Sequence, residues 1–167
     1  MTRCGAGFPR HDVRATRENT MTYDETLAFL QLREAKINRH DANALAADHT
    51  DAGVVHSPIF PHVQGVVNIQ RSYRALFTMF PDWHITFDAP IIDGDRAAHP
   101  FTARATHAGE FLGVPGTGRK FQIVGAMIYR FEDGLIAEER RIYDFTGLLM
   151  QVGVLKGKPG RRGGDGG

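Results

Sequence analysis

The sequence predicts one α+β domain, and the order of its elements carries that prediction. Apolar residues recur at helical spacing between residues 23 and 80. From Trp83 onward, apolar and polar residues alternate instead, and Asp-Gly pairs interrupt the alternation. Helices followed by consecutive hairpin strands are typical of α+β folds, in which helices pack on one side of a mostly antiparallel sheet.

Helices are expected throughout the first half of the chain. The first begins after Thr22, because Thr22 followed by Glu25 is the pattern of a capping box. Asp41 can cap a short second helix. The third runs from about Val66 to Phe80 and ends before a proline.

Strands are expected before the third helix and through the second half of the chain. Asp93-Gly94 and Asp133-Gly134 are hairpin turn signals that separate neighbouring strands. The predicted strands cover residues 53–58, 83–88, 96–111, 119–132 and 135–145. A short helix over residues 147–152 follows the last of them.

Length and composition limit what this domain can be. A chain of 167 residues forms one ordinary domain, which we place at residues 22–155. Residues 1–21 lack periodicity and are expected to be flexible, and the Gly-rich residues 156–167 are expected to be disordered. The formal net charge is +1, so no surface for nucleic acid or an anionic membrane is indicated.

Redox, metal and membrane chemistry find little support in the sequence. Cys4 is the single cysteine, which rules out an intramolecular disulfide and a cysteine-based zinc site. The histidines show no metal-ligand spacing, and we expect no metal and no cofactor. The chain contains no apolar run of 18 residues, and its N-terminus has no apolar signal region. We therefore expect a cytoplasmic protein without a membrane span.

A family resemblance rests on two stretches of the second half. The first places His107, Gly109 and Gly113 before Thr117-Gly118-Arg119. The second runs from Asp133-Gly134 through Asp144 into the segment Gly147–Gly153. Together they resemble the SnoaL-like polyketide cyclases of the nuclear-transport-factor-2-like superfamily, over roughly residues 23–153. The resemblance implies a cone-shaped, curved antiparallel or mixed sheet around about three helices, with an internal cavity.

The same resemblance implies a cofactor-independent aldol-type ring closure of a polyketide-derived ester. Asp144 corresponds to the family's general base, which removes a proton next to a carbonyl group. An aspartate that faces an apolar cavity is expected to have a raised pKa, which suits a base. The alternative is structural, because Asp144 precedes the last predicted helix and aspartate favours the N-cap position.

Further candidate site residues follow from strand phase and from the resemblance. His107 shares a face with small apolar residues and could orient Asp144 or protonate the new alkoxide. Arg140 shares the face of Asp144 and either forms an ion pair or receives a substrate oxygen. Further substrate contacts are expected from His56, Tyr73, Phe77 and Trp83, the last three as core aromatics that also line the cavity.

Other functions stay open on the sequence alone. A non-catalytic module that binds a small apolar or polyketide-like molecule, or a dimeric scaffold, fits the same fold. An isomerase or an epoxide hydrolase is a further alternative, although no Asp-Arg-Asp relay is evident. Both faces of the strand at residues 119–132 are apolar, so we expect a homodimer through the convex face of the sheet.

Overall fold

The computed structural model describes residues 20–156, and its helices begin and end close to the predicted positions. They are α1 (Tyr23–Asn38), α2 (Ala42–Ala47), α3 (Val66–Met79) and α4 (Phe145–Val152). The predicted capping box is present: Thr22 Oγ1 accepts from the Glu25 amide, and the Glu25 carboxylate accepts from the Thr22 amide. Asp41 likewise caps α2 by accepting from the Ala44 amide. The predictions for residues 1–19 and 157–167 lie outside the described residues.

One mixed sheet holds all the strands of the described chain. They are β1 (His49–His56), β2 (Val63–Gln64), β3 (His84–Phe87), β4 (Ile91–Asp93), β5 (Arg96–Thr106), β6 (Lys120–Glu132) and β7 (Leu135–Tyr143). The sheet has seven strands in the order β2-β1-β7-β6-β5-β3, with β4 also paired to β5. All neighbours are antiparallel except β1 and β7, which run parallel. The predicted series of hairpin strands therefore continues beyond β7 into β1, which pairs with β7 in parallel although the two strands are far apart in the sequence.

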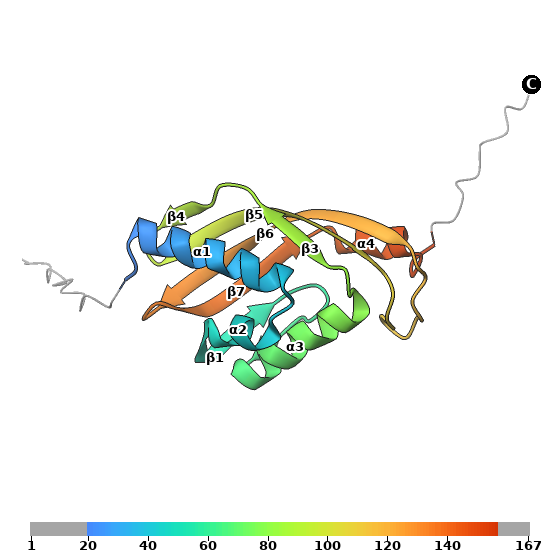
Figure 1. Cartoon of the computed structure of the whole chain (residues 1–167), viewed down its shortest axis with the longest axis horizontal. Helices are drawn as coiled ribbons and strands as arrows, with labels where there is room; N and C mark the ends of the chain where they lie inside the picture. The colour runs from blue at the N-terminus through green and yellow to red at the C-terminus, as the bar shows by residue number, and fades with distance from the viewer. Residues whose placement is uncertain (1–19, 157–167) are drawn as a thin grey trace, which may run out of the picture.

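The N-terminal helices pack against this sheet, as the α+β prediction requires. Figure 1 shows α1 lying across the strands, with α2 and α3 grouped beside β1. α1 contacts β3 and β4, and α3 contacts β1 and β2. The helix α4 follows β7 and packs on β6 at the other end of the sheet. Within residues 20–156, no helix is long and apolar enough to cross a membrane.

Among the predicted boundaries that are wrong, two bear on the candidate site. β5 ends at Thr106, not at residue 111, so His107 lies just beyond the strand. Its backbone still pairs with Arg119 O and the Gly118 amide, which continues the ladder for one residue. β1 begins at His49, before the predicted residue 53, because His49 pairs with Ile136 of β7.

Aromatic rings fill the space between α3, α4 and the inner face of the sheet. The ring of Phe80 packs edge-on against Phe121 and Phe111, at centroid distances of 5.0 and 5.4 Å. Trp83 joins them, with its ring centroid 6.0 Å from that of Phe80. The other end of the interior, beneath α1 and α2, is polar, and the candidate site lies there.

Candidate ligand pocket and its buried ion-pair network

Arg33 places a charge where α1 faces the core. The buried residues of this helix follow helical spacing as Thr26, Leu30, Arg33 and Ile37. The Arg33 Nη1 donates to Asp48 Oδ2 at 2.9 Å, and its Nη2 donates to Glu139 Oε2 at 2.5 Å. A carboxylate–guanidinium–carboxylate arrangement thus exists inside the protein, although the sequence showed no such relay. The sequence signal that could have revealed this arrangement is the position of Arg33 within the apolar stripe of the first helix.

Glu139 is the centre of this network. It is fully buried on β7, and its Oε1 accepts from Arg141 Nε at 2.6 Å. Its Oε2 also faces the Nε2 of His49 at 3.3 Å. Burial alone would raise the pKa of Glu139, but the charges of Arg141 and Arg33 outweigh burial and hold it well below its usual value. Glu139 is therefore an ionised partner of cations and a weak base.

Tyr73 joins α3 to the two arginines. Its hydroxyl oxygen accepts from Arg33 Nη2 and from Arg141 Nη2, each at 2.6 Å. Burial raises the pKa of Tyr73, and the guanidinium charges of Arg141 and Arg33 offset part of that rise. The phenol consequently keeps its proton at neutral pH, and that proton is available to a further acceptor.

An apolar pocket lies against Tyr73 and Arg141. Its lining consists of Ile37, Ser57, Ile59, Phe60, Tyr73, Leu76, Trp83, Met127, Arg141 and Tyr143. It leaves about 20 Å³ for the centre of a water-sized sphere, which is enough for roughly one water molecule. The segment from Ser57 to Phe60 forms one wall, so a larger ligand requires this wall to move.

Two donors at this pocket have no acceptor among the described residues. The hydrogen bonds of Arg141 use its Nε and Nη2, which leaves Nη1 unpaired. Tyr73 accepts both of its hydrogen bonds and donates none. A ligand oxygen in the pocket can therefore take a charge-assisted hydrogen bond from Arg141 and another from the Tyr73 hydroxyl.

Asp144 was expected to face an apolar cavity, but it lies outside the pocket described above and takes the helix N-cap position of the alternative prediction. Asp144 is exposed, and its Oδ1 accepts from the Gly147 amide at 2.8 Å as the N-cap of α4. The phase along β7 explains the difference. Glu138, Arg140 and Ile142 share the face of Asp144, and these alternate residues lie outside the buried face of Glu139 and Arg141.

His107 is buried as predicted but has a different partner. Its Nδ1 lies 3.0 Å from Thr117 Oγ1, which itself donates to the Val152 carbonyl. Because the threonine hydrogen is used there, Nδ1 carries the imidazole hydrogen and Nε2 is the acceptor. That Nε2 is buried without a hydrogen-bond partner, between the rings of Phe80 and Phe111. The described hydrogen bonds do not join His107 to Asp144.

The predicted substrate contacts divide between the pocket and other places. Tyr73 and Trp83 line the pocket. Arg140 is exposed and pairs with Glu138 at 3.2 Å, which is the ion-pair alternative of the prediction. His56 lies outside the pocket with its Nδ1 3.1 Å from Pro61 O, and Phe77 stacks on His40 at 4.4 Å.

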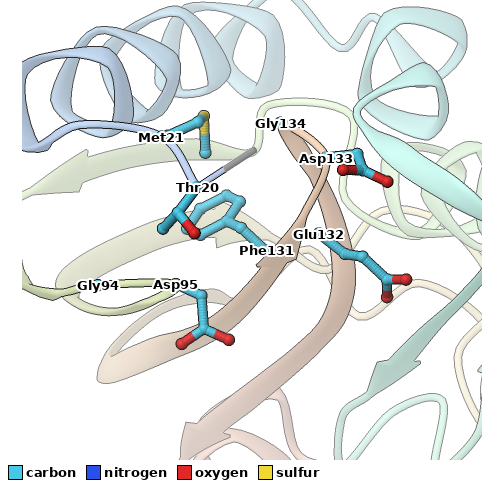
Figure 2. A pocket seen from close by; sticks show the side chains of 8 residues that line it. All are labelled: Thr20, Met21, Gly94, Asp95, Phe131, Glu132, Asp133 and Gly134. Atoms are coloured by element: carbon cyan, nitrogen blue, oxygen red, sulfur yellow. The ribbon is translucent and has the colours of Figure 1, made fainter. Parts of the chain in front are cut away.

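A further pocket lies at the turns of the sheet, near the start of α1. Its lining consists of Thr20, Met21, Gly94, Asp95, Phe131, Glu132, Asp133 and Gly134. Figure 2 shows the carboxylates of Asp95, Glu132 and Asp133 pointing away from Phe131 and Met21. This pocket brings together none of the predicted site residues, and acidic side chains that point outward do not form a binding site.

The fold and the interior define the class of protein. Three N-terminal helices packed on one mixed sheet, with a polar corner inside it, describe an α+β protein of the nuclear-transport-factor-2-like type. The family model of SnoaL-like polyketide cyclases matches residues 27–152, which is most of the chain. The chain belongs to this family.

Solved structures agree with this assignment. AclR of Streptomyces galilaeus, provisionally described as a hydroxylase, is 26% identical with a TM-score of 0.71, and the match covers 83% of this chain and 91% of AclR. IdmH of Streptomyces antibioticus, provisionally described as a polyketide cyclase, is 27% identical with a TM-score of 0.64. The match covers 78% of this chain and 99% of IdmH. A protein of Catenulispora acidiphila, solved with trimethylamine, is 18% identical and shares the fold with a TM-score of 0.63. The match covers 80% of this chain and 95% of that protein. No curated protein matches the chain.

Proposed function

We propose that this protein is a cofactor-independent cyclase that acts on a polyketide-derived carbonyl compound in the pocket beside Tyr73 and Arg141. The observation that carries the proposal is the pair of unpaired donors at an otherwise apolar pocket. Family membership supports the reaction class, since the family is that of SnoaL-like polyketide cyclases.

The chemistry proposed for these residues is electrophilic activation. When a carbon next to a carbonyl group loses its proton to a water molecule in the pocket, negative charge develops on the carbonyl oxygen. Tyr73 and Arg141 donate to that oxygen and stabilise the enolate in a site with little water. The enolate carbon then attacks a second carbonyl group of the same molecule and closes the ring, and water returns a proton to the new alkoxide.

This assignment replaces Asp144 as the main catalytic group. The exposed Asp144 is committed to the α4 cap, whereas Tyr73 and Arg141 are held by the buried network and line the pocket. Because hydrogen bonds within that network hold both side chains in place, their donors are positioned before a negative charge develops in the reaction. We propose a structural role for Asp144 and a catalytic role for Tyr73 and Arg141.

A non-catalytic binding module is the second candidate. The narrow pocket and the capping role of Asp144 favour it, because neither indicates a site built around a strong base. The two candidates share the ligand position and differ only in turnover.

Proton exchange in a simple ketone tests the proposal. Benzylacetone, an aryl ketone without charge, is incubated with the protein in deuterium oxide, and exchange next to the carbonyl is followed by NMR. We expect the wild type to accelerate exchange and Tyr73→Phe to reduce the acceleration by about 10²-fold, the usual effect of removing one oxyanion donor.

Asp144→Asn is the matched control, since asparagine also caps helices and removes the carboxylate base. It should exchange as the wild type does. Loss of exchange in Asp144→Asn with full exchange in Tyr73→Phe would refute the assignment. Binding without exchange would select the non-catalytic module.

A further inference from the structure

We infer that the ligand site continues from the inner pocket beside Tyr73 and Arg141 into an outer hollow between β2 and α3, and that the Phe60 ring separates the two. This inference rests on the proposed function, because it takes the inner pocket as the place of the reacting carbonyl group. It adds a second binding region and the class of ligand: an elongated carbonyl compound with an oxygen acceptor at its far end.

The outer hollow adjoins the inner pocket at one residue. Its lining consists of Phe60, His62, Val63, Gln64, Asn68, Arg71, Ser72 and Ala75. Phe60 is the one residue that also lines the inner pocket. The hollow is open to solvent and leaves about 370 Å³ for the centre of a water-sized sphere, compared with about 20 Å³ in the inner pocket. A ligand larger than a water molecule therefore finds most of its room on the outer side of Phe60.

The helix α3 forms a wall of both spaces. Four of its residues at helical spacing line the outer hollow, namely Asn68, Arg71, Ser72 and Ala75. Tyr73 and Leu76, each next in the chain to one of these, line the inner pocket. Since Phe60 lies against both spaces, a ligand that extends past Phe60 from the Tyr73 hydroxyl continues along α3 into the hollow.

Phe60 lies on a connection that can move without opening the sheet. This connection joins β1 to β2, a strand of two residues at the edge of the sheet. Its hydrogen bonds are mostly internal: the Ser57 amide and hydroxyl donate to Phe60 O at 3.1 and 3.3 Å, and the Phe60 amide donates to Ser57 Oγ at 3.0 Å. The Ile59 backbone adds a hydrogen bond with Tyr143. The Phe60 ring can therefore swing aside while the pairs of β1 with β2 and β7 remain in place.

The lining of the outer hollow gives the far end of the ligand its character. Val63 and Ala75 continue the apolar surface beyond Phe60, and Arg71 completes it with a charge. Arg71 is exposed and has no hydrogen-bond or ion-pair partner within residues 20–156, and no carboxylate lines the hollow. An oxygen at the far end of the ligand can accept from the Arg71 guanidinium, whereas an amine would find no counter-charge there.

Quenching of Trp83 fluorescence by acrylamide tests the position of the partition. Trp83 is the single tryptophan of the chain, lines the inner pocket and is 7% exposed. Phe60→Ala should leave space that its surroundings fill only partly, and should raise the quenching constant about twofold or more. Phe87→Ala is the matched control, because Phe87 is a half-buried phenylalanine that lines neither space. Its quenching constant should equal that of the wild type.

Three methyl ketones test the length of the ligand: 2-butanone, 2-nonanone and 8-oxononanoate, which is 2-nonanone with a carboxylate at its far end. The change in Trp83 fluorescence gives each dissociation constant. We expect 2-nonanone to bind about 10–100-fold more tightly than 2-butanone, because five further carbon atoms are partly removed from water. Ala75→Glu places a carboxylate in the outer hollow and should remove this gain without changing 2-butanone binding. Val67→Glu, at an exposed position of α3 outside the hollow, should keep the gain.

Arg71→Gln tests the far end of the ligand. It should weaken 8-oxononanoate binding by roughly two- to fivefold, as for an exposed ion pair, and leave 2-nonanone binding unchanged. An unchanged constant for 8-oxononanoate would overturn the role of Arg71. Equal quenching in Phe60→Ala and Phe87→Ala would overturn the partition, and a full gain for 2-nonanone in Ala75→Glu would overturn the outer hollow as part of the site. The ketone comparison does not depend on the folding of Phe60→Ala.

The exchange of benzylacetone protons decides the proposed function separately. If the wild type exchanges these protons but Ala75→Glu binds 2-nonanone as the wild type does, the proposed function stands and the outer hollow is refuted. If exchange is absent while Ala75→Glu removes the gain in affinity, the two-part ligand site stands and the protein is a binding module. Absence of any fluorescence response to the three ketones overturns the inference.

Discussion

Arg33 and Glu139 lie where the interior of the protein is most strongly charged. Arg33 is 1% exposed and Glu139 is 0% exposed, and the two pair with each other while Asp48 and Arg141 supply further counter-charges. A buried ion pair adds little stability over a well-packed apolar pair, but removing one partner leaves a charge without compensation. The network is therefore sensitive to single changes.

Glu139→Gln should destabilise the protein strongly. It leaves Arg33, Arg141 and His49 around a neutral amide, and the loss expected for a broken buried pair is about 3–5 kcal/mol. Urea unfolding followed by circular dichroism measures it. Glu138→Gln, which removes a half-buried carboxylate from the neighbouring position, should cost well under 1 kcal/mol. Similar losses in both variants would contradict the role given to the network.

The same carboxylate predicts the direction of a pH effect. The pKa of Glu139 in the folded state lies well below the ordinary value of 4.5. The contribution of Glu139 to stability is therefore complete above about pH 4.5 and is lost as the pH falls through the lower folded value. The difference in unfolding free energy between wild type and Glu139→Gln should shrink below pH 4.5, and a difference that grew on acidification would contradict this.

Asp144 should behave as a helix cap. Asp144→Ala removes the acceptor for the Gly147 amide and should cost about 1 kcal/mol, whereas Asp144→Asn should cost little. Thermal unfolding of both variants measures the difference. If both retained wild-type stability but lost ketone exchange, Asp144 would be the base that the family resemblance implies.

At the scale of elements, α4 is tied to the β5–β6 connection through one threonine. Thr117 accepts from His107 Nδ1 and donates to the last carbonyl of α4, at Val152. The connection also lies against the end of α3, where the amides of Ala108 and Gly109 donate to Met79 O. A Cβ on Gly109 would lie 2.4 Å from Thr78 O, so only glycine fits this approach.

Thr117→Val should loosen this connection. The change keeps the shape of the side chain but leaves the His107 Nδ1 and the Val152 carbonyl without their partner. A loss of about 1 kcal/mol is expected, with faster hydrogen exchange in α4. Thr86→Val on β3 is the control, because its exposed hydroxyl makes only a 3.5 Å contact. Equal effects of the two changes would mean that the tie is unimportant.

At the scale of the whole molecule, the outer face of the sheet carries an apolar patch. Val124 is 66% exposed and Ile142 is 52% exposed, and Ile128 lies on the same side of β6 as Val124. Ala126 pairs with Ile142 across β6 and β7, which makes the patch continuous. Such a patch on a sheet face is typical of a protein interface.

We expect a homodimer that covers this face. Light scattering at micromolar concentration should give twice the mass of the 18.5 kDa chain. Val124→Lys places a charge in the patch and should produce monomers, whereas Leu32→Lys on α1 should not change the mass. A monomeric wild type would refute the interface.

The sequence by itself determined the elements and the family. Capping residues, helical spacing, Asp-Gly turns and period-two alternation are local signals, so the helices and most strands could be predicted within a few residues. The motifs around His107 and Asp144 indicated the SnoaL-like family, which the family model confirms. Tyr73 and Trp83 were predicted as pocket residues, and both line it.

Only the tertiary structure decided which face of β7 is the inside. Alternation shows that Asp144, Arg140 and Glu138 share a face, but it does not show which face the helices cover. The answer came from Arg33, which lies more than a hundred residues away in the chain and pairs with Glu139. That contact turns Glu139 and Arg141 inward and Asp144 outward, because a buried charge requires a partner and an exposed carboxylate does not.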